Sequence, residues 1–216
     1  VKELAQVESA RKKLIGTRIG VIGAPSDWLI SSIASPVAVK QKLGIEIVNI
    51  AIDEVIDAYN AIADTPSDCA TLAEKATTKA TKEAVPGAVK LYYALKEVAT
   101  RHRLNGFTIR CFDLLGVVRN TSCYALARLN ADGIVAGCEG DIPTLLTMMI
   151  TKAVTGVSGF QANPSRIDPK TGEMLVAHCT IPLNMVTRYE LDTHFESGIG
   201  IGIRGYMAEG PVTIFK

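Results

Sequence analysis

Two carboxylates flank a glycine in the segment Cys138-Glu139-Gly140-Asp141. An apolar stretch precedes this acidic turn and another follows it, which indicates the end of a buried strand and the start of a helix. Carboxylate oxygens are hard ligands suited to Mn²⁺ or Mg²⁺. Glu139 is either a solvated loop acid or a site residue, and its apolar surroundings favour the site. Asp141 is expected to cap the following helix and can still serve the site.

Few other residues could act as ligands or proton carriers, since the chain has only three histidines. His102 lies among arginines at a helix end and is interpreted as structural. His178 lies in an apolar strand, where it is either a hydrogen-bonded core residue or a ligand. His194 is open to the same two interpretations. Asp113 follows another apolar stretch and either caps a turn or faces the same crevice as Glu139.

These residues must be positioned by strands that alternate with helices. Such alternation predicts an α/β fold: a doubly wound, mostly parallel sheet with helices on both faces. Ligands bind such sheets at the carboxyl ends of the strands, which here include the loop 23–28 and the acidic turn. The strands are predicted at 19–22, 45–50, 107–111 and 133–137, and the helices at 3–14, 36–43, 52–63, 68–80, 87–104, 122–130 and 142–154.

The sequence changes in character after Gly156, where short apolar segments follow one another between Gly/Pro turns. We expect an α/β domain over 1–156 and an incomplete β-rich, barrel-like domain over 157–216. Because the last predicted strand ends one residue before Lys216 and has no partner strand after it, we also expect the chain to be part of a longer protein. The strands of this second part are predicted at 160–162, 174–181, 198–203 and 212–215.

Bulk properties exclude several classes of function. The formal charge is +1 and the basic residues are scattered, which argues against nucleic acid or a membrane surface as partner. Five cysteines without framework spacing predict reduced thiols and a cytoplasmic protein. The segment 200–205 matches GxGxxG, but its glycines alternate with isoleucines as in a strand, so a dinucleotide site is not expected there.

The order of these segments resembles the superfamily of L-fucose isomerase and L-arabinose isomerase, and most of all its uncharacterised fucose isomerase-like proteins. The acidic turn with the downstream Leu146-Thr147-Met148 is the most specific part. The other matching segments are 19–23, 25–28, 109–114, 162–165, 177–179 and 194–198.

The resemblance implies that 1–156 corresponds to the second domain of the isomerase fold. It also implies aldose–ketose isomerisation of a small sugar through an ene-diol, with Mn²⁺ or another divalent cation bound by two carboxylates and by histidine. A homo-oligomer, either a trimer or a hexamer, is expected for the full-length protein. Glu139 matches the first carboxylate of the family, and His178 resembles a histidine that follows the second.

Asn163 stands where the family has its second carboxylate. An amide oxygen can bind a metal, but an amide does not transfer protons as a carboxylate does. The predicted site therefore has Glu139 and Asn163 as catalytic residues and adds His178 as a metal ligand. Asp113, Trp28 and His194 are the predicted substrate contacts.

Two other functions remain open at this point. A non-catalytic sugar-binding or regulatory homologue is the main alternative, because of Asn163. A nucleotide-binding protein that uses the loop 23–27 is a weaker one.

Overall fold

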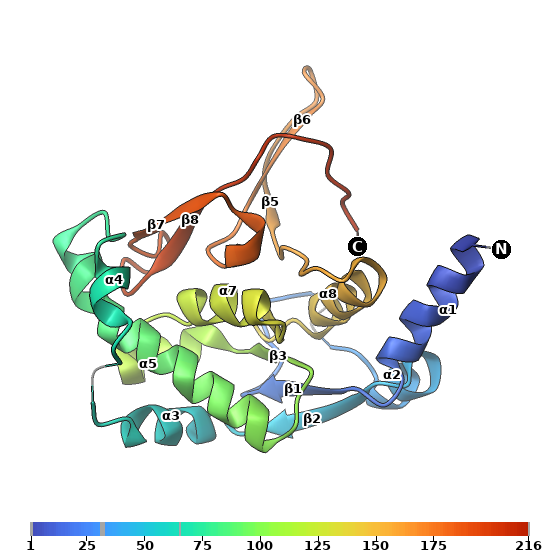
Figure 1. Ribbon diagram of the computed structural model, residues 1–216, viewed down its shortest axis with the longest axis horizontal. Helices are drawn as coiled ribbons and strands as arrows, with labels where there is room; N and C mark the ends of the chain where they lie inside the picture. Colours follow the sequence, from blue (N-terminus) through green and yellow to red (C-terminus); the bar gives the residue numbers. More distant parts are fainter. Residues whose placement is uncertain (1, 31–32, 65, 216) are drawn as a thin grey trace.

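The computed structural model describes residues 2–30, 33–64 and 66–215, and Figure 1 shows an α/β layer with two hairpins above it. The helical elements are α1 (Lys2–Leu14), α2 (Pro36–Leu43), α3 (Ile52–Ala61), α4 (Cys69–Ala73), α5 (Lys79–Arg101), η1 (Cys111–Leu114), α6 (Leu115–Val118), α7 (Cys123–Asp132), α8 (Ile142–Thr155) and η2 (Leu183–Met185). The strands are β1 (Arg18–Ile22), β2 (Glu46–Ile50), β3 (Gly106–Ile109), β4 (Val135–Gly137), β5 (Asn163–Asp168), β6 (Glu173–Ala177), β7 (Arg188–Asp192) and β8 (Gly202–Tyr206).

The central sheet is parallel, with strand order β2-β1-β3-β4. Its two faces are covered by two separate apolar clusters, as the alternation of side chains along a strand requires. On β1, Ile22 packs in the cluster that contains Leu91 of α5, whereas Val21 packs in the cluster that contains Leu145 of α8. The predicted doubly wound α/β fold is confirmed.

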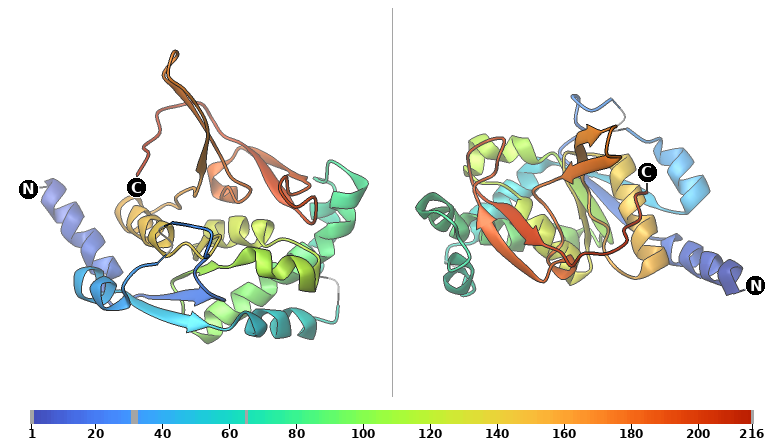
Figure 2. Two further views of the ribbon diagram at one scale, coloured as in Figure 1. Left: turned by 180° about the vertical axis from the view of Figure 1, so that it is seen from behind. Right: turned by 90° about the horizontal axis from the view of Figure 1, so that it is seen from above.

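The rest of the chain forms two antiparallel hairpins, β5–β6 and β7–β8. Ile203 of β8 joins the apolar cluster of α5 and α7, so the β7–β8 hairpin rests on the α/β layer. The β5–β6 hairpin instead projects away from it, as Figure 2 shows, and most of its residues are exposed. Helix α8 ends at a left-handed Gly156, where the predicted boundary lies; a separate domain over 157–216 stays a prediction.

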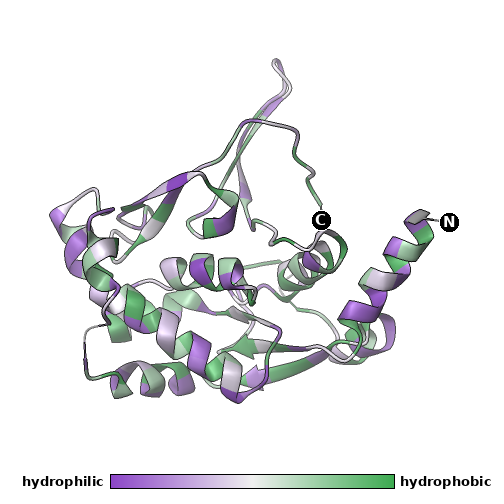
Figure 3. Cartoon of the chain, in the orientation of Figure 1, coloured by the Kyte–Doolittle hydropathy of each residue, from purple (hydrophilic) through white to green (hydrophobic). Residues whose placement is uncertain are grey.

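Two helix predictions were wrong in the same region. The helix expected over 68–80 covers only Cys69–Ala73, and the next helix starts at Lys79 rather than at 87. The Thr78 side chain caps α5 by accepting from the backbone N–H of Thr81. Pro86 therefore lies inside the helix, where it removes one backbone hydrogen bond without ending it. Figure 3 shows hydrophobic and hydrophilic residues alternating along α5, as expected of a helix with one buried side.

Several strand predictions after 156 were also wrong. Segments 160–162 and 212–215 form no strand, β6 ends at Ala177, and β7 was not predicted at all. Strand β8 begins only at Gly202, because Gly200 has φ +70° and lies against the backbone of Thr121. The described residues after β8, 207–215, form no helix.

Across the part of the chain that the structure describes, no helix has both the length and the apolar character needed to cross a membrane.

Candidate functional site

The acidic turn follows β4 and has an unusual backbone. Glu139 and Gly140 both have φ +65°, in the left-handed region. A non-glycine residue in this conformation costs roughly 1–3 kcal/mol, and such residues gather at functional sites. Two neighbouring segments fix the turn: the Gly140 N–H donates to the Ile109 carbonyl at 3.0 Å, and the Ser26 side-chain hydroxyl donates to the Glu139 carbonyl.

Gln161 anchors the strand end beneath the turn. The Cys138 N–H donates to Gln161 Oε1 at 2.8 Å, and the Cys138 carbonyl accepts from Gln161 Nε2 at 3.4 Å and from Thr108 Oγ1 at 3.1 Å. Gln161 is buried, and its amide oxygen satisfies the Cys138 N–H, a backbone group that needs a partner in the interior. This residue was not predicted from the sequence, although an amide within the apolar segment 160–162 was a usable signal.

Asp141 is the helix cap that the sequence predicted. One of its carboxylate oxygens accepts from the Thr144 N–H at 2.9 Å, and the other accepts from the Thr144 hydroxyl at 2.7 Å. Such a cap contributes about 1 kcal/mol to stability. Because both oxygens are engaged with α8, Asp141 positions the turn and does not line the cavity next to it.

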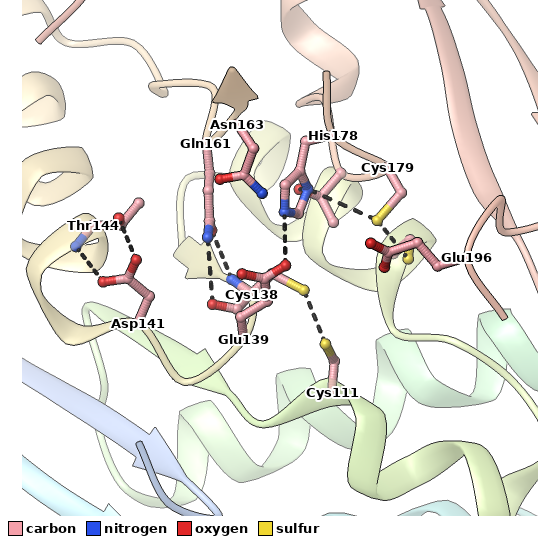
Figure 4. Close-up of polar contacts among 12 residues, drawn as sticks. Cys111, Cys138, Glu139, Asp141, Thr144, Gln161, Asn163, His178, Cys179 and Glu196 are labelled. Atoms are coloured by element: carbon pink, nitrogen blue, oxygen red, sulfur yellow. Dashed lines mark hydrogen bonds and ion pairs between the residues drawn. The ribbon is translucent and has the colours of Figure 1, made fainter. Parts of the chain in front are cut away.

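Glu139 faces His178, which directly follows β6. The His178 Nε2 lies 3.7 Å from Glu139 Oε1, and the two side chains are 4% and 16% exposed, respectively (Figure 4). Thr180 Oγ1 lies 2.8 Å from the other ring nitrogen, Nδ1. Burial lowers the pKa of His178, but its contacts with Cys179 and Glu139 outweigh burial and raise it to about 10. The buried ring is thus held between a carboxylate and a thiol.

An open cavity of about 510 Å³ lies over the turn. Its lining includes three residues that the sequence predicted, Glu139, Asn163 and Trp28, together with Leu29, Phe112 and Glu196. Trp28 packs edge-on against Phe112, with ring centroids 5.6 Å apart. Glu196 places a second carboxylate in the cavity, and it was not predicted because only the packing of the chain brings it there.

The other two predicted substrate contacts do not line this cavity. Asp113 Oδ1 pairs with Arg110 Nε at 3.2 Å, and Arg110 also contacts Asp27. This ion pair holds the carboxylate at the turn, which is the alternative role foreseen for it. His194 is only 4% exposed and lies behind the cavity, with its ring 6.3 Å from that of Phe112.

Four of the five cysteines form two close thiol pairs beside the turn, and all five are free. The Sγ atoms of Cys111 and Cys138 are 3.1 Å apart, and those of Cys123 and Cys179 are 3.2 Å apart. Hydrogen bonding from Cys123, helped by the two nearby histidines, lowers the pKa of Cys179 well below its ordinary value despite burial. His194 joins the second pair, so that three potential ligand atoms lie within 4.8 Å of one another.

No family model matches the chain. The chain is similar to a sulfoquinovose isomerase from Clostridium sp. (strain MSTE9), with 25% identity over 153 residues. The matched part is 69% of this chain but 33% of the relative, so the chain spans about a third of that protein's length. The similarity supports a protein of the sugar isomerase kind and does not single out L-fucose isomerase.

Proposed function

We propose that this chain is part of a metal-dependent sugar isomerase that interconverts an aldose and a ketose through an ene-diol. The observation that carries the proposal is the position of Glu139: a strained turn at a strand end presents its carboxylate to a cavity and to His178. The similarity to sulfoquinovose isomerase supports a sugar as the substrate. A homo-oligomeric full-length protein and a cytoplasmic location belong to the same proposal.

Glu139, which lines the cavity, and His178 beside it fit a divalent cation such as Mn²⁺. Glu139 Oε1 and His178 Nε2 are 3.7 Å apart, a separation that two ligand bonds of about 2.1 Å each can span. Thr180 holds Nδ1 of the same ring, in the way that second partners commonly orient a ligating histidine. Asn163 lines the same cavity and can add an amide oxygen. When bound, the ion would polarise the sugar carbonyl and stabilise the enediolate charge.

Glu139 is the residue that we assign to carbon proton transfer. Its carboxylate takes the proton from C2 of the open-chain aldose, and the C2 electron pair forms the C1–C2 double bond of the ene-diol. Glu139, whose acid proton exchanges with solvent, then delivers a proton to C1, while the hydrogen of the C2 hydroxyl passes to O1. The product is the ketose, with no net gain or loss of electrons. A carboxylate within reach of the substrate suits this shuttle.

The hydroxyl proton needs a second carrier, and Asn163 cannot serve as one. Glu196 lines the cavity and its Oε2 lies 4.0 Å from His194 Nε2. We assign the proton between O2 and O1 to Glu196. The carboxylate that Asn163 lacks would then come from a different part of the chain, and this favours a catalyst over a binding protein.

The test is isomerisation by the full-length protein with Mn²⁺ and a panel of aldoses that includes sulfoquinovose. Ketose formation and deuterium uptake from D₂O are followed by NMR. Glu139→Gln should lower kcat at least about 100-fold, the usual contribution of a proton-transferring group. Glu173→Gln, on the exposed β6, is the matched control and should leave kcat unchanged.

Two results would contradict the proposal. Equal activity of the wild type and Glu139→Gln would remove Glu139 from the mechanism. Tight sugar binding without turnover or deuterium uptake for every aldose would instead support the non-catalytic alternative. Glu196→Gln tests the second carboxylate separately from Glu139 and should slow isomerisation. Asn163→Ala should leave proton transfer in place.

A further inference from the structure

Three segments far apart in the sequence bring two thiols and an imidazole together behind the cavity. Cys123 is the first residue of α7, Cys179 follows β6, and His194 follows β7. Their exposed fractions are 3%, 8% and 4%, so the cluster is enclosed by protein. Their potential ligand atoms all lie within 4.8 Å of one another. Buried polar groups need partners, and a bound metal ion would supply one that all three of these groups share.

The donor set selects a soft metal ion. Thiolate and imidazole ligands favour Zn²⁺, and a site of two cysteines and one histidine with a fourth open position is a known zinc arrangement. The Cys123 and Cys179 sulfurs are 3.2 Å apart. Tetrahedral zinc with bonds of about 2.3 Å needs sulfurs about 3.8 Å apart. A disulfide needs about 2.05 Å, which is a larger displacement of the two side chains than zinc requires.

His194 is held in a manner that suits a ligand. Its Nδ1 lies 2.9 Å from Ser197 Oγ, and that hydroxyl donates in turn to the Ile199 carbonyl at 3.3 Å. The Ser197 N–H also donates to Nδ1 at 3.3 Å, so these contacts fix the ring through Nδ1, and Nε2 is the nitrogen that a metal would have to bind. The Cys111–Cys138 pair has no third ligand of this kind among the described residues, so it does not form a comparable site.

We propose that Cys123, Cys179 and His194 form a zinc site that adjoins the Glu139 cavity at Glu196 and shares no ligand with Glu139. The bound ion would join the start of α7 to the segments that follow β6 and β7. Because His178 directly precedes Cys179, the zinc site would also fix the backbone that presents His178 to Glu139. This inference does not depend on the isomerase proposal.

The experiment measures zinc in the chain purified under reducing, oxygen-free conditions. Inductively coupled plasma mass spectrometry should find one zinc per chain, and Co²⁺ substitution should produce the thiolate-to-metal charge-transfer band. His194→Gln and Cys179→Ser should lose the zinc. Cys69→Ser alters a buried free cysteine outside the cluster and should retain it, as should Glu139→Gln. Chelation should lower the Tm of the wild type and of Cys69→Ser. It should leave the Tm of His194→Gln and Cys179→Ser unchanged.

Several outcomes would overturn the proposal. A wild-type protein that takes up no zinc, or a cobalt form without the thiolate band, would do so even if every variant failed to fold. Retention of one zinc by His194→Gln would exclude that ligand. The two cysteines would be a redox pair instead if the purified protein contained a Cys123–Cys179 disulfide and bound no zinc after that disulfide was reduced. Loss of isomerase activity in Glu139→Gln with zinc retained would separate the two sites.

Discussion

Replacing Gly140 with alanine tests how the acidic turn is held. Gly140 has φ +65°, and a Cβ at this position would lie 2.5 Å from the Ala24 carbonyl oxygen and 3.0 Å from the Ser26 nitrogen. Both neighbours are backbone atoms, so the loop 24–26 must move or the turn must change shape. Gly156 offers a matched control at the other end of α8, because it has φ +81° and a Cβ there would meet no neighbouring group within 4 Å.

The two substitutions share one cost and differ in another. An alanine in the left-handed region costs about 1 kcal/mol at either position. Gly140→Ala adds the strain of forced contact with the backbone, which is about 1–3 kcal/mol for overpacked sites. We therefore expect Gly156→Ala to lower the free energy of unfolding by about 1 kcal/mol and Gly140→Ala to lower it by about 2–4 kcal/mol.

Urea unfolding, followed by circular dichroism, measures both values at one pH. Gly140→Ala should also impair sugar turnover, since the loop that must move leads to Trp28 in the cavity wall. Equal destabilisation by the two substitutions would refute the close packing of the loop 24–26 on the turn. Unchanged turnover in Gly140→Ala would show that the shape of the turn does not position Glu139.

Two further predictions concern the anchor of the strand end and a buried phenol. Gln161→Leu leaves the Cys138 N–H without its acceptor and should lower the free energy of unfolding by about 1–3 kcal/mol in urea titrations; an unchanged midpoint would contradict the anchoring role. Burial raises the pKa of Tyr124 to about 12 although Arg128 opposes it, so the stability that neutral Tyr124 contributes is complete below pH 10 and is lost as the pH rises towards 12. Between pH 9 and 12, Tyr124→Phe should therefore lose about 2 kcal/mol less stability than the wild type, and parallel pH profiles would disprove this.

The sheet could be predicted because its strands are short and uniformly apolar, and because helices separate them. Residues near helix starts were harder to place. Pro86 suggested a start, but the Thr78 cap and the buried face of α5 decided the actual one. In the second part of the chain, a left-handed Gly200 shifted the start of β8, a tertiary contact that no local pattern reveals.

The site was predictable only in its local part. Glu139 and Asp141 could be found because they adjoin a strand and a helix that the sequence itself marks. Glu196 was missed because only packing of the hairpins brings it to the cavity, and Cys123 and Cys179 were missed as a pair for the same reason. The left-handed conformation of Glu139 was also hidden, since glutamate gives no sign of it and the neighbouring Gly140 is only a hint.

The base of the β5–β6 hairpin contributes one side of the cavity, through Asn163. Asn163 begins β5 and pairs with Ala177 at the end of β6, so Asn163 and His178 stand side by side at the base of the hairpin. Glu139 follows β4 of the parallel sheet, which the hairpin does not extend. A tilt of the hairpin would therefore move Asn163 and His178 together while Glu139 stays in place. The separation of Glu139 from Asn163 and His178 would then depend on the angle of the hairpin. A molecule that binds the exposed apolar residues of the hairpin would change this angle, and with it the separation.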